Sequence, residues 1–186
     1  YRVENEDYIV VMKPKVDTKA NDNIISRVSD NLVLKADYLI TEGKSITHYI
    51  RLQMIEAFSK HNTKIACILV DEAQFLTKKQ VEELVYIANV IGIPTICYGL
   101  RTDFKGELFE GSKWLMAWAQ KIEEMQTRPM SAIGHKNKKA TMNLRKINGK
   151  PVFEGEQIEI DNGDKVEYLP VTMNDHLYQR KLVGEY

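Results

Sequence analysis

The sequence predicts an α/β protein with a parallel sheet flanked by helices, followed by a small β-rich domain. Two observations predict this fold class. Apolar, strand-like runs alternate with segments of helical periodicity up to about residue 125, and such alternation is typical of parallel strands joined by crossover helices. After Thr127 the pattern changes to short consecutive strands with Asn-Gly turns, which indicate β-hairpins. We therefore expect two domains, residues 1–126 and 127–186.

In the first domain, the spacing of apolar residues and the capping signals at helix ends predict the strands and helices. Strands are expected at Tyr8–Met12, Val33–Ile40, Ile65–Val70 and Thr95–Tyr98, and helices at Ser45–Lys60, from Thr77 onward, and at Gly111–Gln120. Thr77 and Gln80 fit a capping box at the start of the second helix. Gly92 fits the left-handed position that follows a helix.

The second domain is expected to be a set of hairpins. Its predicted strands are Ala140–Ile147, a short strand at Val152, Gln157–Ile160 and Lys165–Val171, with turns at Asn148-Gly149 and Asn162-Gly163. Asn-Gly suits the turn that joins two antiparallel strands, because both positions take a positive φ. Residues 179–186 carry no recognisable signal and are expected to form a tail or a subunit contact.

The composition excludes several classes of partner. Across 186 residues, 26 basic and 26 acidic side chains cancel, so no overall field attracts nucleic acid or an anionic membrane. No apolar run approaches the roughly 20 residues that span a bilayer, and no signal peptide opens the sequence. Cys67 and Cys97 lie in apolar runs and are interpreted as small buried side chains in a reducing compartment. We expect a cytoplasmic location.

The run Ile68-Leu69-Val70-Asp71-Glu72 places two carboxylates directly after an apolar strand. Ligands of open α/β sheets bind at the carboxyl ends of the strands, and in phosphoryl transfer such acids hold Mg²⁺ or orient the nucleophile. Many strands also end in acids simply to meet water. The residues alone leave both interpretations open.

Two further features have a functional and a structural interpretation. Gly43-Lys44-Ser45 follows a strand and opens a helix, but a phosphate loop requires a glycine where this chain has Tyr38. Ser45 is equally suited to be a helix N-cap. His135 and His176 lack partners at metal-ligand spacing, so surface or hairpin roles are expected for them.

Aromatic side chains occur in a charged loop beyond the last parallel strand. Phe104 and Phe109 alternate there with Arg101, Asp103, Lys105 and Glu107. Apolar rings in such a loop favour contact with a ligand over a place in the core.

Three segments together resemble the type II thymidine kinases, the cytosolic and bacterial thymidine kinase family. They are Val70-Asp71-Glu72-Ala73-Gln74-Phe75, Cys97-Tyr98-Gly99-Leu100-Arg101-Thr102-Asp103-Phe104-Lys105-Gly106-Glu107-Leu108-Phe109 and Lys139-Ala140-Thr141-Met142-Asn143-Leu144-Arg145. Lys150 to Gln157 and Met12-Lys13-Pro14 through Asp17 fit the same pattern. The resemblance implies a P-loop-kinase-like sheet, a C-terminal "lasso" domain, and transfer of the ATP γ-phosphate to the 5′-hydroxyl of thymidine, a step of pyrimidine deoxynucleoside salvage for DNA synthesis.

The resemblance also implies a role for each matching residue. Glu72 would be the general base for the 5′-hydroxyl, Asp71 would hold Mg²⁺ through water, and Ala73 and Gln74 would lie beside the nucleotide. The thymine ring would be enclosed by Phe75, Leu100, Phe104 and Phe109.

In the family, a loop of the second domain closes over the base and contacts it through backbone groups. Here that loop would span about residues 158–168 and end at Tyr168. Its implied substrate-binding residues are Ile158, Glu159, Ile160, Asp161, Asn162, Gly163 and Tyr168.

The sequence departs from the family pattern in two places. Met130 to Gly134 and Thr172 to His176 stand where the family has the Cys/His pairs of a structural zinc site. Only His176 is a candidate ligand there, so we expect no zinc. A glycine-rich phosphate loop would precede Tyr1, and this sequence contains no substitute for it. The chain as given is therefore expected to transfer almost no phosphate, whereas the parent protein is expected to be an active kinase.

Three functional hypotheses follow. The first is an ATP-dependent thymidine kinase that forms a homotetramer, as the family does. The second is a catalytically silent relative that binds a nucleoside or nucleotide as a regulatory module. The third, weaker hypothesis is an unrelated ATPase that uses Gly43-Lys44-Ser45.

Overall fold

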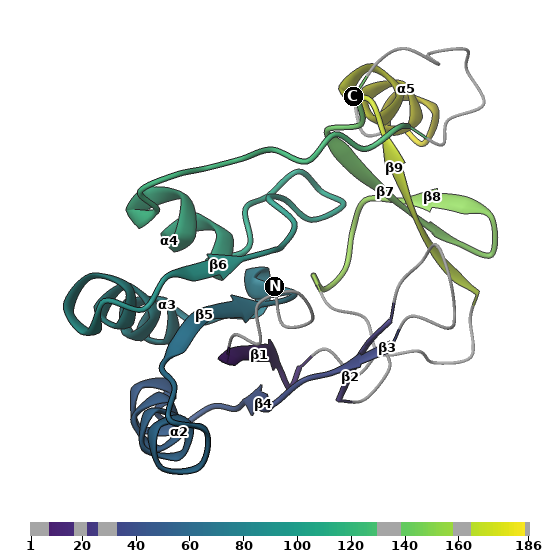
Figure 1. The fold of residues 1–186 in the computed structure, drawn as a ribbon. Helices are drawn as coiled ribbons and strands as arrows, with labels where there is room; N and C mark the ends of the chain where they lie inside the picture. Colours follow the sequence, from purple (N-terminus) through teal and green to yellow (C-terminus); the bar gives the residue numbers. More distant parts are fainter. Residues whose placement is uncertain (1–7, 17–21, 26–32, 130–138, 158–164, 185–186) are drawn as a thin grey trace. The chain divides into compact units, whose positions relative to one another are not determined.

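The computed structural model describes residues 8–16, 22–25, 33–129, 139–157 and 165–184 (Figure 1). The chain forms two compact units. Unit 1 comprises residues 1–100 and 110–120, and unit 2 comprises residues 101–109 and 121–186. The loop 101–109, which follows the last strand of unit 1, is therefore part of unit 2.

Unit 1 is built on a parallel sheet, which confirms the predicted fold class. The strands are β1 (Tyr8–Pro14), β4 (Tyr38–Ile40), β5 (Ile65–Val70) and β6 (Thr95–Cys97), in the order β4-β1-β5-β6. Met12 pairs with Val70, and Val70 pairs with Cys97. The carboxyl ends of β1, β5 and β6 are therefore level with one another, and the residues that follow them share one edge of the sheet.

The predicted single strand Val33–Ile40 is wrong, because the chain changes sheets within it. β3 (Val33–Lys35) pairs with β2 (Asn23–Ile25) in a separate antiparallel ribbon, whereas β4 joins the parallel sheet. Asp37 causes the change: its carboxylate accepts a hydrogen bond from the Val11 backbone N–H at 2.7 Å, and its own N–H donates to the Val11 carbonyl at 2.7 Å.

Three helices pack along the sheet, with α3 between α2 and α4 (Figure 1). They are α2 (Ile46–His61), α3 (Lys78–Tyr86) and α4 (Glu110–Trp118). The capping box of Thr77 and Gln80 is present, and Gly92 has a φ of 83° after the helix. Ile87–Ile91 continues α3 as a π-helix, η2, which the sequence did not predict. Met12, Ile50, Ile68 and Leu84 belong to the buried core that joins the helices to the sheet.

Unit 2 contains an antiparallel sheet in the order β8-β7-β9, as the hairpin signals predicted. β7 (Met142–Ile147) and β8 (Lys150–Val152) meet at Asn148-Gly149, which have φ values of 51° and 80°. β9 (Val166–Val171) pairs along the whole of β7. The predicted strand Gln157–Ile160 and turn Asn162-Gly163 fall almost entirely outside the described residues.

A C-terminal helix, α5 (Met173–Leu182), which the sequence did not predict, extends into the segment 179–186 that was expected to form a tail or a subunit contact. Thr172 starts it as the N-cap, accepting a hydrogen bond from the Asp175 N–H. His176, in its first turn, is buried, which corrects the expectation of a surface or hairpin role.

The predictions about membranes and cysteines can be compared with the structure. Within the described residues, no helix combines the length and apolarity needed to cross a bilayer. Cys67 and Cys97 are free thiols, but they are partly rather than fully buried. Burial raises the pKa of the Cys97 thiol to about 12.

Candidate functional site

Asp71 and Glu72 lie at the carboxyl edge of the parallel sheet, directly after β5. The Asp71 N–H donates to the Met12 carbonyl of β1 at 2.9 Å. On the other side, the Ala73 N–H donates to the Tyr98 carbonyl, which follows β6, at 2.8 Å. The backbone on either side of the two acids is therefore fixed to both neighbouring strands. This is the edge at which ligands of open α/β sheets bind.

Glu72 has a strained backbone. Its φ of 50° and ψ of 36° place it in the left-handed region, directly before the short 3₁₀ helix η1 (Ala73–Phe75). Few residues other than glycine adopt this conformation, and each such residue costs about 1–3 kcal/mol. Strain of this kind clusters at functional sites, where the surrounding structure maintains it. The outlier therefore favours a functional role for Glu72 over the role of a simple solvated acid.

The Gln74 side chain connects Glu72 to the end of β6. Its amide N–H group donates to the Glu72 carboxylate at 2.6 Å, and its amide oxygen accepts from the Leu100 N–H at 3.1 Å. Gln74 is buried, so both bonds are shielded from water. A hydrogen bond to a charged group is stronger than one between neutral groups. Gln74 thus orients the Glu72 carboxylate.

Two glycines allow other segments to approach η1 closely. A Cβ at Gly99 would lie 2.6 Å from the Gln74 Oε1 atom. A Cβ at Gly111, in the first turn of α4, would lie 2.5 Å from the Ala73 carbonyl oxygen. The next residue, Ser112, donates its hydroxyl hydrogen to the Leu100 carbonyl at 2.6 Å. These contacts hold the predicted site residues of unit 1 in one cluster. Its members are Asp71, Glu72, Ala73, Gln74, Phe75 and Leu100.

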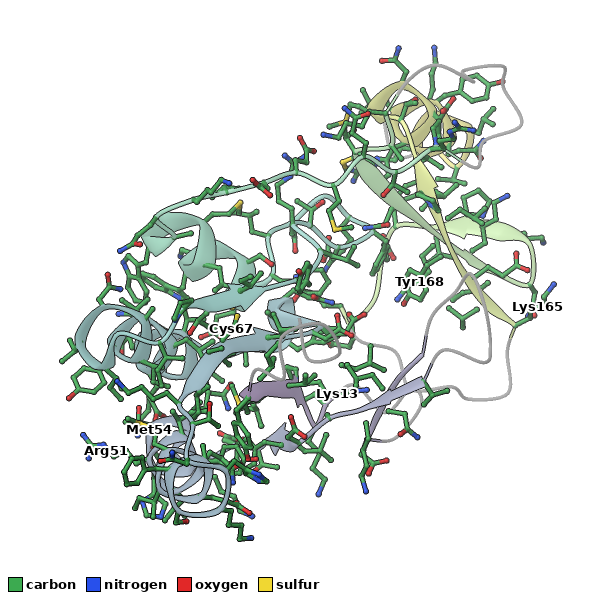
Figure 2. All side chains as sticks on the ribbon, in the orientation of Figure 1. Lys13, Arg51, Met54, Cys67, Lys165 and Tyr168 are labelled. Atoms are coloured by element: carbon green, nitrogen blue, oxygen red, sulfur yellow. The ribbon has the colours of Figure 1, made fainter. Side chains whose placement is uncertain are left out.

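Within unit 2, the predicted ring-bearing residues have different environments. Phe104 is buried beneath the Arg145 guanidinium group, whose central carbon lies 3.7 Å from the ring centroid. Phe109 is also buried, whereas Tyr168 on β9 is 40% exposed (Figure 2). The remaining predicted substrate residues, Ile158, Glu159, Ile160, Asp161, Asn162 and Gly163, lie outside the described residues.

Lys13 was not singled out as a site residue, although it lies next to the last residue of β1, at the same sheet edge (Figure 2). It is 1% exposed, and its ammonium group donates to the Asn23 carbonyl at 3.3 Å. A charged side chain directly after an apolar strand and before a proline is the signal that identifies it. Buried lysines are uncommon, so Lys13 belongs among the candidates for function.

The structure argues against the interpretation of Gly43-Lys44-Ser45 as a phosphate loop. Ser45 is the N-cap of α2, and it also donates its hydroxyl hydrogen to the Glu83 carboxylate at 2.6 Å. The Thr47 N–H donates to the same carboxylate at 2.8 Å. The anion-binding end of this helix is therefore occupied by a carboxylate of the protein itself.

The described residues differ in how well they suit the two metals considered. No cluster of three or more His, Cys, Asp or Glu side chains that could hold a metal is found among them. Mg²⁺ does not require such a cluster, because one or two carboxylates and substrate phosphates suffice, and the partly buried Asp71 meets that need. A structural zinc site does require such a cluster. The remaining candidate zinc ligand, His176, has its Nε2 atom 2.7 Å from the Phe104 carbonyl oxygen.

Comparison with known proteins identifies the family. The family model described as thymidine kinase matches residues 1–175. The chain belongs to the thymidine kinase family.

Curated relatives support this assignment. The thymidine kinase of Lactococcus lactis subsp. lactis is 38% identical over 164 residues, covering 88% of this chain and 78% of that protein. The thymidine kinase of Xanthomonas axonopodis pv. citri is 39% identical over 157 residues, covering 84% and 69%. That of Lactiplantibacillus plantarum is 46% identical over 129 residues, covering 69% and 64%. As a member of the thymidine kinase family, the chain is a kinase, and therefore a transferase.

Proposed function

We propose that this protein is an ATP-dependent thymidine kinase of deoxynucleoside salvage that acts in the cytoplasm. The observation that supports this most directly is the strained Glu72 at the carboxyl edge of the sheet, with its carboxylate oriented by Gln74. In the proposed reaction, Glu72 accepts the proton of the thymidine 5′-hydroxyl. The 5′-oxygen forms a bond to the γ-phosphorus of ATP as the bond to the β-phosphate oxygen breaks, and ADP leaves.

Asp71 and Glu72 have separate proposed roles. The Asp71 carboxylate, at the end of β5, would hold Mg²⁺ through water, and the metal would neutralise charge on the phosphates. Glu72 is the base because its carboxylate is fixed by the 2.6 Å bond from Gln74. A base within reach of the hydroxyl is worth about 10²–10⁴-fold in rate. Ala73 and Gln74 would lie beside the nucleotide.

Thymine recognition is proposed to use aromatic and backbone groups together. Phe75, Leu100, Phe104 and Phe109 would enclose the ring, and residues 158–163 with Tyr168 would contact its edge. A flat apolar slot suits a planar base, and unmatched backbone groups penalise a wrong one. We also propose residues 1–126 and 127–186 as the two domains of the protein.

The protein is expected to hold no structural zinc, because His176 is engaged with Phe104 and Phe153 instead. Its ring lies edge-on to the Phe153 ring, with centroids 5.1 Å apart. Elemental analysis of the purified protein should find well under one zinc per chain, and dialysis against a chelator should leave the melting temperature unchanged. One tightly bound zinc per chain would contradict this prediction.

We propose that copies of the chain associate through α2, as part of a homotetramer. Leu52, Ile55 and Phe58 on this helix are 51%, 66% and 68% exposed. Figure 2 shows Arg51 and Met54 projecting from the same helix. Exposed apolar faces of this kind mark protein interaction sites. The second copy is the proposed occupant, since the same face on both chains forms a two-fold interface.

Replacing Ile55 with Glu should shift the protein to a smaller species, because a charge would be buried in the contact. Light scattering coupled to size-exclusion chromatography measures the mass directly. Lys79→Glu on α3 is the matched control, since Lys79 is also exposed but lies outside the apolar face. An unchanged mass for Ile55→Glu would exclude α2 as the interface.

The proposed function is tested by a phosphate-transfer assay with thymidine and ATP. The assay is run on residues 1–186 and on a version extended before Tyr1 with the phosphate loop that the resemblance implies. Formation of thymidine monophosphate by the extended version supports the proposal. Thymidine binding without any product in either version would instead favour the regulatory module, and neither binding nor product would contradict both.

A further inference from the structure

The loop 101–109 is held within unit 2 by contacts that centre on the Asp103 carboxylate. Its backbone folds around the Asp103 carboxylate. One carboxylate oxygen accepts hydrogen bonds from the backbone N–H groups of Lys105 and Glu107, each at 2.9 Å. A β-bridge between Thr102 and Leu108 closes the loop. Asp103 is buried, so its second oxygen also needs a donor.

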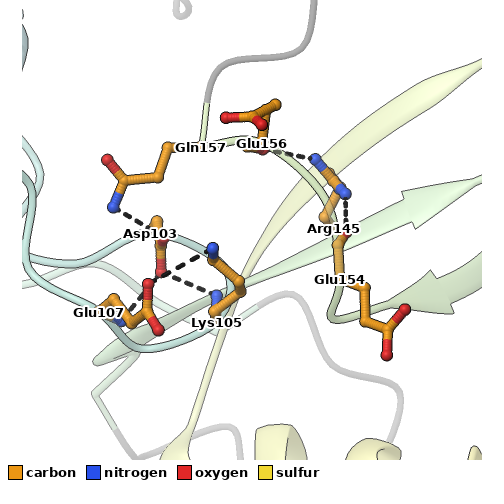
Figure 3. Close-up of polar contacts among 7 residues, drawn as sticks. All are labelled: Asp103, Lys105, Glu107, Arg145, Glu154, Glu156 and Gln157. Carbon is orange, nitrogen blue, oxygen red and sulfur yellow. Dashed lines mark hydrogen bonds and ion pairs between the residues drawn. The ribbon is translucent and has the colours of Figure 1, made fainter.

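That donor is Gln157. Its side-chain N–H group donates to the second Asp103 oxygen at 3.0 Å (Figure 3). Gln157 is the last described residue before residue 158, where the proposed base-contacting loop begins. The side chain joins two segments that are 54 residues apart in sequence. One of them carries Phe104 and Phe109, and the other is the segment that follows β8.

Arg145 of β7 fixes the same two segments independently. Its guanidinium group donates to the carbonyl groups of Glu154 and Glu156 and lies over the Phe104 ring (Figure 3). A Cβ at Gly155, whose φ is 105°, would lie 2.7 Å from the Arg145 Nη2 atom. The segment 154–156 is therefore packed directly on Arg145, and Gln157 emerges from it in a defined position.

We propose that the Asp103–Gln157 hydrogen bond positions the loop 101–109, which carries two of the rings of the proposed thymine site. This inference rests on the proposed function. Arg145 provides a fixed base, and the Asp103–Gln157 bond sets the spacing between the loop 101–109 and the segment 154–157. Gln157 is a positioning residue, because it acts through Asp103 and the loop that folds around Asp103. Losing the bond weakens thymidine binding and leaves ATP binding and phosphate transfer unaffected.

The test exchanges the carboxylate and the amide. Gln157→Glu puts two carboxylates 3.0 Å apart and breaks the contact. We expect the Kd and KM for thymidine to rise by about tenfold, while kcat and the KM for ATP stay within about twofold. Adding Asp103→Asn should restore thymidine affinity, since the new amide donates to the new carboxylate. Asp103→Asn alone should bind nearly normally, because Gln157 can turn its amide and accept the hydrogen bond.

Glu156→Gln is the matched control. It removes a neighbouring charge, and only the backbone carbonyl of Glu156 takes part in the network. Calorimetry with thymidine and steady-state kinetics, all on the version extended before Tyr1, give the readouts. Unchanged thymidine affinity in Gln157→Glu would overturn the inference. It would also be overturned if the double variant Gln157→Glu/Asp103→Asn failed to restore thymidine affinity, or if Gln157→Glu lost kcat and ATP affinity in parallel. A wild-type protein that does not bind thymidine would overturn the proposed function, and this inference with it.

Discussion

Replacing Glu72 with Gln is expected to lower kcat for thymidine phosphorylation by about 10²–10⁴-fold, the usual contribution of a positioned general base. Glutamine keeps the shape of the side chain and an oxygen that accepts the Gln74 hydrogen bond, but it cannot take the proton of the 5′-hydroxyl. Thymidine affinity should therefore stay close to that of the wild type. Steady-state kinetics and calorimetry on the version extended before Tyr1 separate the two effects.

Two further variants show whether the loss of kcat in Glu72→Gln arises in the phosphate-transfer step. Glu82→Gln removes an exposed carboxylate on α3 that pairs with Lys78, and it should leave kcat unchanged. Glu72→Gly should abolish turnover but cost no stability, because glycine adopts the φ of 50° without strain. If Glu72→Gln retained most of its kcat, Glu72 would not be the base.

Local signals in the sequence predicted most elements of unit 1. Ile65–Val70 is a strand with the predicted bounds, because a short apolar run rich in β-branched residues favours a strand of a buried sheet. Thr77 with Gln80 and Gly92 marked the two ends of the helical segment correctly, since capping depends on residues within one turn. The signal for the Asn148-Gly149 turn also lies in adjacent residues, so this turn was predicted correctly.

The errors occur where distant contacts decide the structure. Nothing near Val33–Ile40 shows that Asp37 bonds to Val11, 26 residues away, and divides the strand. The start of α5 did have a local signal in Thr172 and Asp175, but much of its apolar surface is exposed, so its helical periodicity is weak.

The candidate site was predictable only in part, for the same reason. The acids after β5 were visible in the sequence, and the resemblance supplied their proposed roles. The left-handed backbone of Glu72 and the bridging position of Gln74 depend on Leu100, 26 residues further along the chain. Likewise, the place of Phe104 under Arg145 depends on a contact that no local pattern encodes.

Replacing Gly111 with Ala should both destabilise unit 1 and reduce turnover. The new methyl group would lie 2.5, 2.8 and 2.9 Å from the carbonyl oxygens of Ala73, Gln74 and Leu76, all of them backbone atoms that cannot turn away. Either α4 or η1 must move. Overpacking of this kind costs about 1–3 kcal/mol, which urea denaturation measures as a lower midpoint. Moving η1 also displaces Gln74 from Glu72, so kcat should fall by about tenfold or more, as expected for a lost hydrogen bond to a charged group.

Gly99→Ala provides the comparison that separates the two effects. Its methyl group would meet the Gln74 side-chain oxygen at 2.6 Å and the Gln74 backbone nitrogen at 3.0 Å. The side-chain oxygen can shift, so the stability loss should be smaller than for Gly111→Ala. The shift takes the Gln74 amide away from Glu72, so the loss of kcat should be similar. Lys113→Ala, at an exposed position on α4, controls for substitution in that helix. If Gly99→Ala kept full turnover while Gly111→Ala lost it, the orientation of Glu72 would not depend on Gln74.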